Sequence, residues 1–125
     1  MPYRNMSVRP ISGALGAEID GVDLSGTLND DIISEVRRAL HENLVVFFHD
    51  QVLTPDQHMA FALCFGELET HRYAAGLPSH PEILPIIKEA NDGAANFGGI
   101  WHSDTTSHEA PPLGSVLYAL DVPDS

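Results

Sequence analysis

The sequence is poor in cysteine, in basic residues and in long apolar runs, and each shortage excludes a class of protein. A single cysteine, Cys64, excludes a framework of internal disulfides and fits a reducing compartment. Six Lys and Arg stand against eighteen Asp and Glu, for a formal net charge of -12. Such a surface repels nucleic-acid phosphates, and the longest strongly apolar run, residues 44–48, is far too short to cross a bilayer. We therefore expect a soluble, cytoplasmic protein that binds neither nucleic acid nor membrane.

The length and apolar content predict one folded domain. The chain has 125 residues, of which 43% are hydrophobic, and this is about the size of one modest domain with a core to bury. No internal repeat or low-complexity stretch interrupts it. We expect residues 1–125 to belong to a single domain.

Helix and strand signals are clearest in the first half of the chain. Residues 6–26 mix short alternating apolar positions with glycines, which predicts two short strands joined by a turn. Thr27 or Asn29 caps a predicted helix with a buried stripe over residues 32–40. Residues 44–48 predict a strand covered on both faces. The order Thr-Pro-Asp-Gln from Thr54 predicts a capping box and a helix to about residue 65, with glycine at its end.

The second half has weaker signals. Residues 67–81 are polar and contain glycine, so they predict a loop. Residues 83–90 predict a strand at an edge or a bulge, because Pro85 cannot donate to a ladder, and residues 114–122 predict a final strand. One sheet holding both strands would still expose edges. We therefore expect one of two arrangements. Either the chain forms a homo-oligomer through those edges, or these residues are the N-terminal part of a longer protein.

His102 and Asp104 are the candidate metal ligands. In an extended chain, residues i and i+2 point to the same face, roughly 6.5 to 7 Å apart at Cα. Two histidines and one carboxylate form the facial triad that holds iron(II) and leaves open positions for oxygen and a cosubstrate. The spacing alone is weak support, since the similar run His80-Pro81-Glu82 shows how easily it arises in a chain with seven histidines. A solvated histidine and aspartate in a loop is the alternative.

The segments around this pair carry a resemblance to a known family. The runs WHSDTT and EAPPLGSVLYALDVP, the segment VVFFHDQVLTPDQHMAFALCFGEL and the early GALGAEIDGVDLS resemble, in order and over nearly the whole chain, the iron(II)- and 2-oxoglutarate-dependent dioxygenases of the TauD/TfdA family. The resemblance implies a mixed α/β, mainly β fold. These residues would form the N-terminal part of a distorted double-stranded β-helix, a jelly roll of the clavaminate synthase-like kind, with flanking helices.

The resemblance also implies site residues and cofactors. His102 and Asp104 match iron ligands, and the cofactors are Fe(II), the cosubstrate 2-oxoglutarate and O2. His71, after FGEL, matches a residue that hydrogen-bonds the anionic head of the substrate in taurine-type members, with a surface-loop histidine as the alternative. Tyr73 lies near a substrate-contacting tyrosine but is offset in spacing, so an ordinary packed aromatic is an equal alternative. The second metal histidine and the arginine that pairs with 2-oxoglutarate are not among these residues.

Neighbouring positions refine this expectation. We expect Trp101 to pack beside the metal loop, and Thr105 and Thr106 to place hydroxyl groups beside the metal ligands. Four residues before the metal histidine, taurine-type members carry a substrate-contacting asparagine, whereas this chain has Gly98. The pocket therefore differs in polarity, and the substrate is expected to be a small organic anion of the taurine or alkylsulfonate-like class, with taurine itself not assigned.

Three functions fit these observations. The first is a dioxygenase that hydroxylates this substrate while 2-oxoglutarate is decarboxylated to succinate. The second is a non-enzymatic fragment or a small metal-binding or interaction module, because two protein ligands leave an iron site weak. The third is a cupin-type jelly-roll binding domain without redox chemistry, which shares the architecture but does not account for WHSDTT. We expect the 125 residues alone to be catalytically inert.

Overall fold

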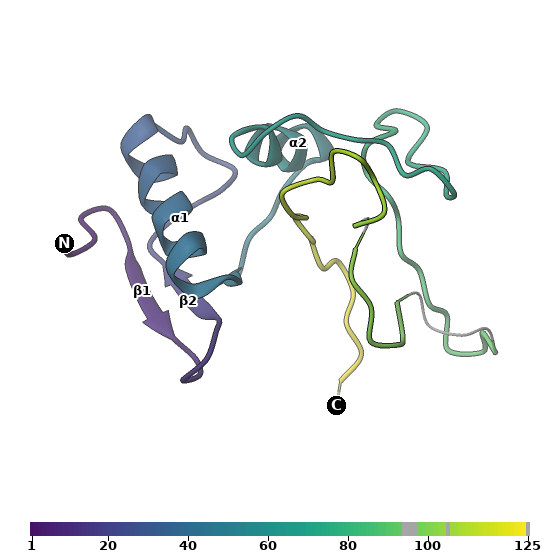
Figure 1. Ribbon diagram of the computed structural model, residues 1–125, viewed down its shortest axis with the longest axis horizontal. Coiled ribbons are helices and arrows are strands. Elements are labelled where there is room, and N and C mark those ends of the chain that lie inside the picture. The colour runs from purple at the N-terminus through teal and green to yellow at the C-terminus, as the bar shows by residue number, and fades with distance from the viewer. Residues whose placement is uncertain (94–97, 105, 125) are drawn as a thin grey trace. The chain divides into compact units, whose positions relative to one another are not determined.

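The computed structural model describes residues 1–93, 98–104 and 106–124 and divides into two compact units, Met1–Phe65 and Gly66–Ser125 (Figure 1). All helices and strands found in the described residues belong to the first unit. In chain order they are β1 (Ser7–Pro10), β2 (Ala17–Asp20), α1 (Asp30–Asn43), β3 (Val46–Phe48) and α2 (Pro55–Leu63).

The three strands form one mixed sheet in the order β1-β2-β3. β1 and β2 pair antiparallel, with Val8 opposite Ile19, and β2 and β3 pair parallel, with Ile19 opposite Phe48. A parallel pair needs a long crossover connection, and α1 lies in that connection. The two predicted N-terminal strands are confirmed.

The third strand is shorter and less covered than the sequence predicts. Leu44 has a φ of +67° and its backbone N–H donates to the Leu40 carbonyl, so it ends α1 and cannot begin a strand. The strand starts at Val46 instead, and the side chain of Phe47 is 45% exposed. The prediction of a strand covered on both faces is therefore wrong: β3 is an edge strand among the described residues, with one face open.

Both helices begin at caps that the sequence predicts. Asn29 Oδ1 accepts a hydrogen bond from the backbone N–H of Ile32 at 2.9 Å. The Thr54 hydroxyl accepts from the Gln57 backbone N–H at 3.2 Å, and the Gln57 side chain accepts from the Thr54 backbone N–H at 2.8 Å, which completes the capping box. At the other end, α2 stops at Leu63, two residues before the predicted end.

The hydrophobic core of the described residues lies wholly in the first unit. Val36 and Ala39 of α1 and Ala17 of β2 are completely buried, and Ile19 and Phe61 are 2% and 5% exposed. Phe61 brings α2 into this core, because its ring meets the ring of Phe48 on β3 edge to face. The helices and the sheet of the first unit thus share one interior.

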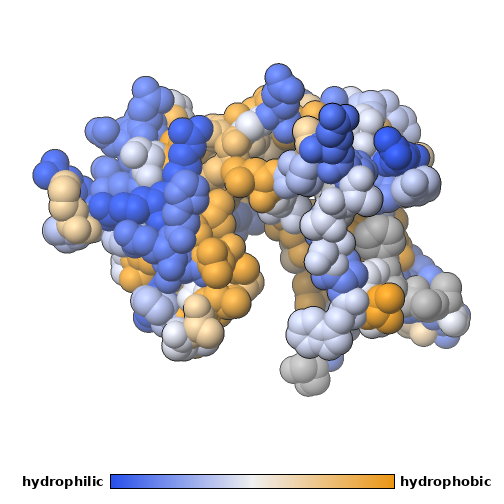
Figure 2. All heavy atoms as spheres, in the orientation of Figure 1, coloured by the Kyte–Doolittle hydropathy of each residue, from blue (hydrophilic) through white to orange (hydrophobic). Residues whose placement is uncertain are grey.

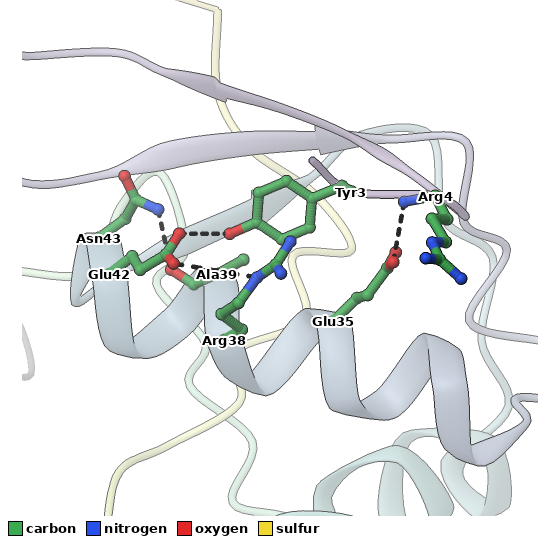
Figure 3. A network of polar contacts seen from close by, with 7 residues as sticks. All are labelled: Tyr3, Arg4, Glu35, Arg38, Ala39, Glu42 and Asn43. Carbon is green, nitrogen blue, oxygen red and sulfur yellow. Dashed lines mark hydrogen bonds and ion pairs between the residues drawn. The ribbon is translucent and has the colours of Figure 1, made fainter. Parts of the chain in front are cut away.

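The N-terminal segment lies along α1 and is held there by an aromatic and charged contact (Figure 3). The Tyr3 hydroxyl donates to Glu42 Oε2 at 2.6 Å. The Arg38 guanidinium carbon lies 3.9 Å from the centre of the Tyr3 ring, a cation–π distance. Partial burial of the phenol is the main reason that the pKa of Tyr3 is raised, and its hydrogen bond to Glu42 adds to the rise.

Glu35 ties the same segment to α1 through the backbone (Figure 3 draws the contact to Arg4). One carboxylate oxygen accepts from the backbone N–H of Arg4 at 2.8 Å and the other from that of Asn5 at 3.0 Å. The bond from Arg4 is the first cause that lowers the pKa of Glu35 below its ordinary 4.5. Met6, the next residue, is 9% exposed and joins the core.

The lowered pKa of Glu35 predicts a pH dependence of folding. Because the folded state favours the ionised carboxylate, Glu35 stabilises the fold above its ordinary pKa, and this contribution is lost as the pH falls from there through the lowered folded value. Urea unfolding of wild type and Glu35→Gln, followed by circular dichroism from neutral pH downwards, should show a smaller acid loss of stability in the variant. Glu67→Gln, outside the first unit, is the control. An identical acid dependence in wild type and Glu35→Gln would contradict this assignment.

The second unit contains turns and loops but no buried side chain among its described residues. A loop closes over residues 77–83: the Leu77 N–H donates to the Ile83 carbonyl at 2.9 Å, and the Ile83 N–H donates to the His80 carbonyl at 3.0 Å. Large apolar side chains of this unit are exposed, including Trp101, Leu117 and Leu120, and Figure 2 shows hydrophobic atoms at the surface of both units.

The two strands predicted in the second unit are wrong for the described residues. Neither residues 83–90 nor residues 114–122 form a strand, because a strand needs a ladder of backbone hydrogen bonds to a neighbouring strand, and the described residues of these segments form no such ladder. Helical residues outnumber strand residues, so the described fold is mixed α/β and not mainly β. No helix in the described residues is long and apolar enough to cross a membrane.

Candidate metal-binding site

His102 and Asp104 lie in a loop, and the structure brings their side chains together. His102 Nε2 is 2.9 Å from Asp104 Oδ1, and the two side chains are 45% and 74% exposed. No helix or strand positions this loop. The two groups thus meet at the surface of the second unit and face solvent, where an ion can reach both.

A backbone carbonyl orients the imidazole. His102 Nδ1 lies 2.6 Å from the Ile100 carbonyl oxygen, and since a carbonyl can only accept, Nδ1 carries a proton. Nε2 is then the nitrogen that faces Asp104 and can give its lone pair to a metal. The tautomer with its proton on Nδ1 is the one that a carbonyl partner fixes in many metal-binding histidines. Sequence reasoning missed Ile100, because a backbone carbonyl leaves no signal in residue type.

These contacts also govern the proton on the imidazole. The pKa of His102 is raised, first by the hydrogen bond to the Ile100 carbonyl and then by the charge and hydrogen bond of Asp104. The imidazolium form is therefore more stable, when no metal is bound, than that of an ordinary histidine. A metal ion at Nε2 must displace that proton, so protons and metal compete for the same atom.

The geometry of the pair fits a divalent metal ion. Two ligand atoms at right angles about an octahedral ion, each about 2.1 Å from it, are about 3.0 Å apart. The separation of 2.9 Å is close to this value, and it is also the length of a hydrogen-bonded histidine–aspartate ion pair. One imidazole and one carboxylate are also the donor types of an iron(II) facial triad. Among the described residues, no group of three His, Cys, Asp or Glu side chains could hold a metal ion, so this loop supplies two candidate ligands.

His71 and Tyr73 form a second local cluster. The Tyr73 backbone N–H donates to His71 Nδ1 at 3.2 Å, and the two rings meet edge to face with centroids 6.4 Å apart. Because Nδ1 accepts this bond, the neutral ring carries its proton on Nε2. Tyr73 is 85% exposed, so it is not packed in a core. The structure therefore groups His71 with Tyr73 and His102 with Asp104, and the substrate and metal roles of these residues stay predictions.

The residues expected around the metal loop have different outcomes. Trp101 is fully exposed, so the expectation that it packs beside the loop is wrong. Thr106 is exposed, and no contact of its hydroxyl to His102 or Asp104 is found. Thr105 lies outside the described residues.

A histidine and an aspartate that share a loop, with metal-chelating separation and an oriented imidazole, define a candidate mononuclear metal site of the non-haem iron kind. The model of the family described as taurine catabolism dioxygenase TauD, TfdA family matches residues 7–125. The chain belongs to this family, which confirms the resemblance found in the sequence.

Individual relatives agree with this assignment. An alpha-ketoglutarate-dependent sulfate ester dioxygenase of Pseudomonas putida is 33% identical over 122 residues, which are 96% of this chain and 39% of that protein. An alkylsulfatase of Acinetobacter baylyi is 30% identical over 132 residues, covering 99% of this chain and 38% of that protein. The chain thus spans about two fifths of the length of these curated relatives.

Solved structures show the same likeness. A taurine dioxygenase from Burkholderia xenovorans superimposes with a TM-score of 0.59 at 39% identity, over 62% of this chain and 28% of that one. The structure of AAD-2 in complex with Mn(II) and N-oxalylglycine superimposes with a TM-score of 0.50 at 38% identity, over 53% of this chain and 26% of that one. The mixed α/β arrangement of the described residues therefore occurs in dioxygenase structures of this family.

Proposed function

We propose that these residues form the N-terminal part of an Fe(II)- and 2-oxoglutarate-dependent dioxygenase that hydroxylates a small organic anion. The observation that carries the proposal is the 2.9 Å separation of His102 Nε2 and Asp104 Oδ1 in a chain of this family. An ion pair of the two side chains has the same separation, so it is the match to this family that supports a metal at these two atoms.

The two side chains have distinct tasks in this proposal. His102 would give the lone pair of Nε2 to the metal, and its Nδ1–H stays hydrogen-bonded to the Ile100 carbonyl, so the ring keeps its orientation when the Nε2 proton leaves. Asp104 supplies a negative oxygen that offsets part of the charge of a divalent ion. A ferrous ion held there, with O2 and 2-oxoglutarate, supplies hydroxylation coupled to release of succinate and CO2.

The substrate class follows from charge and from the relatives. Related proteins are named for sulfate esters, 2,4-dichlorophenoxyacetate and phenoxypropionate, all of which carry an anionic group. Because this chain has a net charge of -12, its overall field repels such a substrate, and binding depends on specific donors. His71, with its proton on Nε2, is the donor that we assign to the anionic head, and the exposed Tyr73 beside it offers an aromatic surface and a hydroxyl.

A hybrid enzyme tests the function. Residues 1–125 replace the matching segment of the Pseudomonas putida sulfate ester dioxygenase, and O2 and 2-oxoglutarate consumption are measured with an alkyl sulfate. We expect Fe(II)-dependent turnover, and we expect His71→Ala to raise the KM for the sulfate ester while the KM for 2-oxoglutarate stays the same. The chain alone, with two candidate ligands in its described part, is the inactive reference.

His80→Ala is the matched control for His71, since it removes a histidine from the same unit but outside the proposed substrate cluster. A folded hybrid that binds Fe(II) and 2-oxoglutarate yet consumes neither O2 nor cosubstrate would contradict the proposed function. An unchanged sulfate ester KM in His71→Ala would remove the substrate role of that residue alone.

A further inference from the structure

The sheet of the first unit has two faces of different character. Directly paired residues of neighbouring strands point to the same face, so Ile19 and Phe48 share one face, while Glu18 and Phe47 share the other. Ile19 is almost completely buried and the Phe48 ring contacts Phe61, so the first face belongs to the core. We call the second face, on which Phe47 is exposed, the outer face of the sheet.

One half of the outer face is apolar. The backbone N–H of Ile11 donates to the Gly16 carbonyl at 3.0 Å, which carries the pairing of β1 and β2 one step further. The side chains of Ile11 and Phe47 both line the space over Gly16, on the same side of the sheet. Val45, two residues before Phe47, points to that side as well. These three side chains are 40–50% exposed, and an apolar sheet face is stable when another layer covers it.

The other half of the outer face carries charges that are paired within the face. Glu18 lies on the central strand, and one of its carboxylate oxygens forms an ion pair with Arg9 on β1. The other oxygen lies 3.2 Å from Nε2 of His49, which follows β3. A carboxylate held between two basic groups can be buried further at a lower cost than an unpaired one. The charged half is therefore compatible with burial beside the apolar half.

The opposite side of this layer, the solvent side of α1, has another composition. Its exposed residues are all polar or charged: Asp30, Asp31, Ser34, Arg37, His41 and Glu42. A helix side of this kind is stable in water. Of the two sides of the layer formed by α1 and the sheet, the outer face is thus the one whose exposed surface favours a partner.

We propose that the remaining polypeptide of the dioxygenase packs on the outer face and covers Ile11, Val45 and Phe47. The inference rests on the proposed function for the identity of this partner. The matched segment makes up 39% of the sulfate ester dioxygenase and 28% of the superimposed taurine dioxygenase, so the related segments occur in chains with much further polypeptide. A second copy of this chain is a poorer partner, because two copies that each carry a net charge of -12 repel one another.

Hydroxyl-radical footprinting read by mass spectrometry tests the proposal. The 125-residue chain, at several concentrations, is compared with the hybrid in which it replaces the matching segment of the Pseudomonas putida enzyme. We expect the oxidation rates of Ile11 and Phe47 to fall severalfold in the hybrid, because a covered side chain is shielded from solvent. His41, exposed on α1, is the internal control and should react at the same rate in both proteins.

Equal oxidation rates of Phe47 in the chain and in the hybrid would overturn the inference. Protection of Phe47 that grows with the concentration of the chain alone would overturn it too, since a second copy would then be the partner. Protection of Phe47 in a hybrid without turnover would refute the proposed function and leave this inference standing. An active hybrid with unprotected Phe47 would do the reverse.

A substitution provides an independent readout. Phe47→Asp places a charge in the apolar half of the outer face, and we expect it to lower the urea midpoint of the hybrid by more than that of the 125-residue chain. Val52→Asp is the matched control, because Val52 is 80% exposed and lies outside the sheet, so its effect should be small in both proteins. A shift from Phe47→Asp that is the same in the chain and in the hybrid would contradict cover by the remaining polypeptide.

Discussion

Replacing His102 with alanine is expected to reduce 2-oxoglutarate consumption by the hybrid dioxygenase to background. The substitution removes the only nitrogen donor of the pair and leaves Asp104 as a single carboxylate on an exposed loop. In the hybrid, Asp104 and the histidine expected from the rest of the dioxygenase would remain, and a facial triad that has lost one of its three ligands holds the metal and its cosubstrate too weakly and in the wrong geometry for turnover. The loss should appear in succinate formation and in O2 uptake together.

His108→Ala is the matched control, because it removes a histidine from the same loop region without touching the pair. Asp104→Asn adds a second comparison: it keeps the shape of the side chain but removes the negative charge, and we expect turnover to fall to background here also. Circular dichroism shows whether each protein remains folded. Turnover by His102→Ala equal to that of the His108→Ala control would refute the assignment of His102 as a metal ligand.

The elements that the sequence predicts well are those with local signals. Asn29 and Thr54 cap their helices because a side-chain oxygen needs only a backbone N–H three residues away. The strands at Ser7–Pro10 and Ala17–Asp20 pair across a short turn, which composition also indicates. In each case the hydrogen-bond partner lies within a few residues or across one short turn, so a short stretch of sequence is enough to predict the element.

The failures concern partners that are distant in the sequence. Residues 83–90 and 114–122 have the composition of strands, but a strand forms only when another backbone satisfies its N–H and C=O groups. The packing expected of Trp101 likewise depends on an apolar surface supplied from elsewhere. Residue type predicts a preference in these segments, and the described contacts decide whether it is realised.

The candidate site is predictable in part for the same reason. The pair His102 and Asp104 is two residues apart, so backbone geometry alone favours their convergence. The contact that orients the ring is a backbone feature, the carbonyl of Ile100. Glycine at position 98 is visible in the sequence as a departure from taurine-type members, whereas the carbonyl contact to the imidazole emerges only in three dimensions.

Phe61→Ala is expected to be the most damaging single substitution in the first unit. The Phe61 ring is 5% exposed and meets two other aromatic rings edge to face, Phe48 at 5.8 Å and Phe65 at 5.2 Å between centroids. Removing a buried phenylalanine side chain leaves a cavity and costs about 3–5 kcal/mol. Small domains are stable by only about 5–15 kcal/mol, so much of the stability of the first unit would be lost.

The contacts of Phe61 decide what is lost with its ring. Phe48 belongs to β3, and Phe65 follows the end of α2. The carbonyl of Cys64, at the end of α2, accepts a hydrogen bond from the guanidinium of Arg37 on α1. With the ring gone, α2 retains its capping box but loses its main anchor to the sheet. The helical circular dichroism signal should therefore be lost at a lower urea concentration than in wild type. In residue-resolved hydrogen exchange, the amides of α2 should be the first to lose protection.

Phe47→Ala provides the control, because it removes the same kind of side chain from a position on β3 that is 45% exposed. Its cost should be well below that of Phe61→Ala, since less apolar surface is returned to water and no closed cavity forms. Urea unfolding by circular dichroism measures both. Equal midpoints for Phe61→Ala and Phe47→Ala would mean that α2 does not pack on the sheet through Phe61, and that the core of the first unit ends at α1.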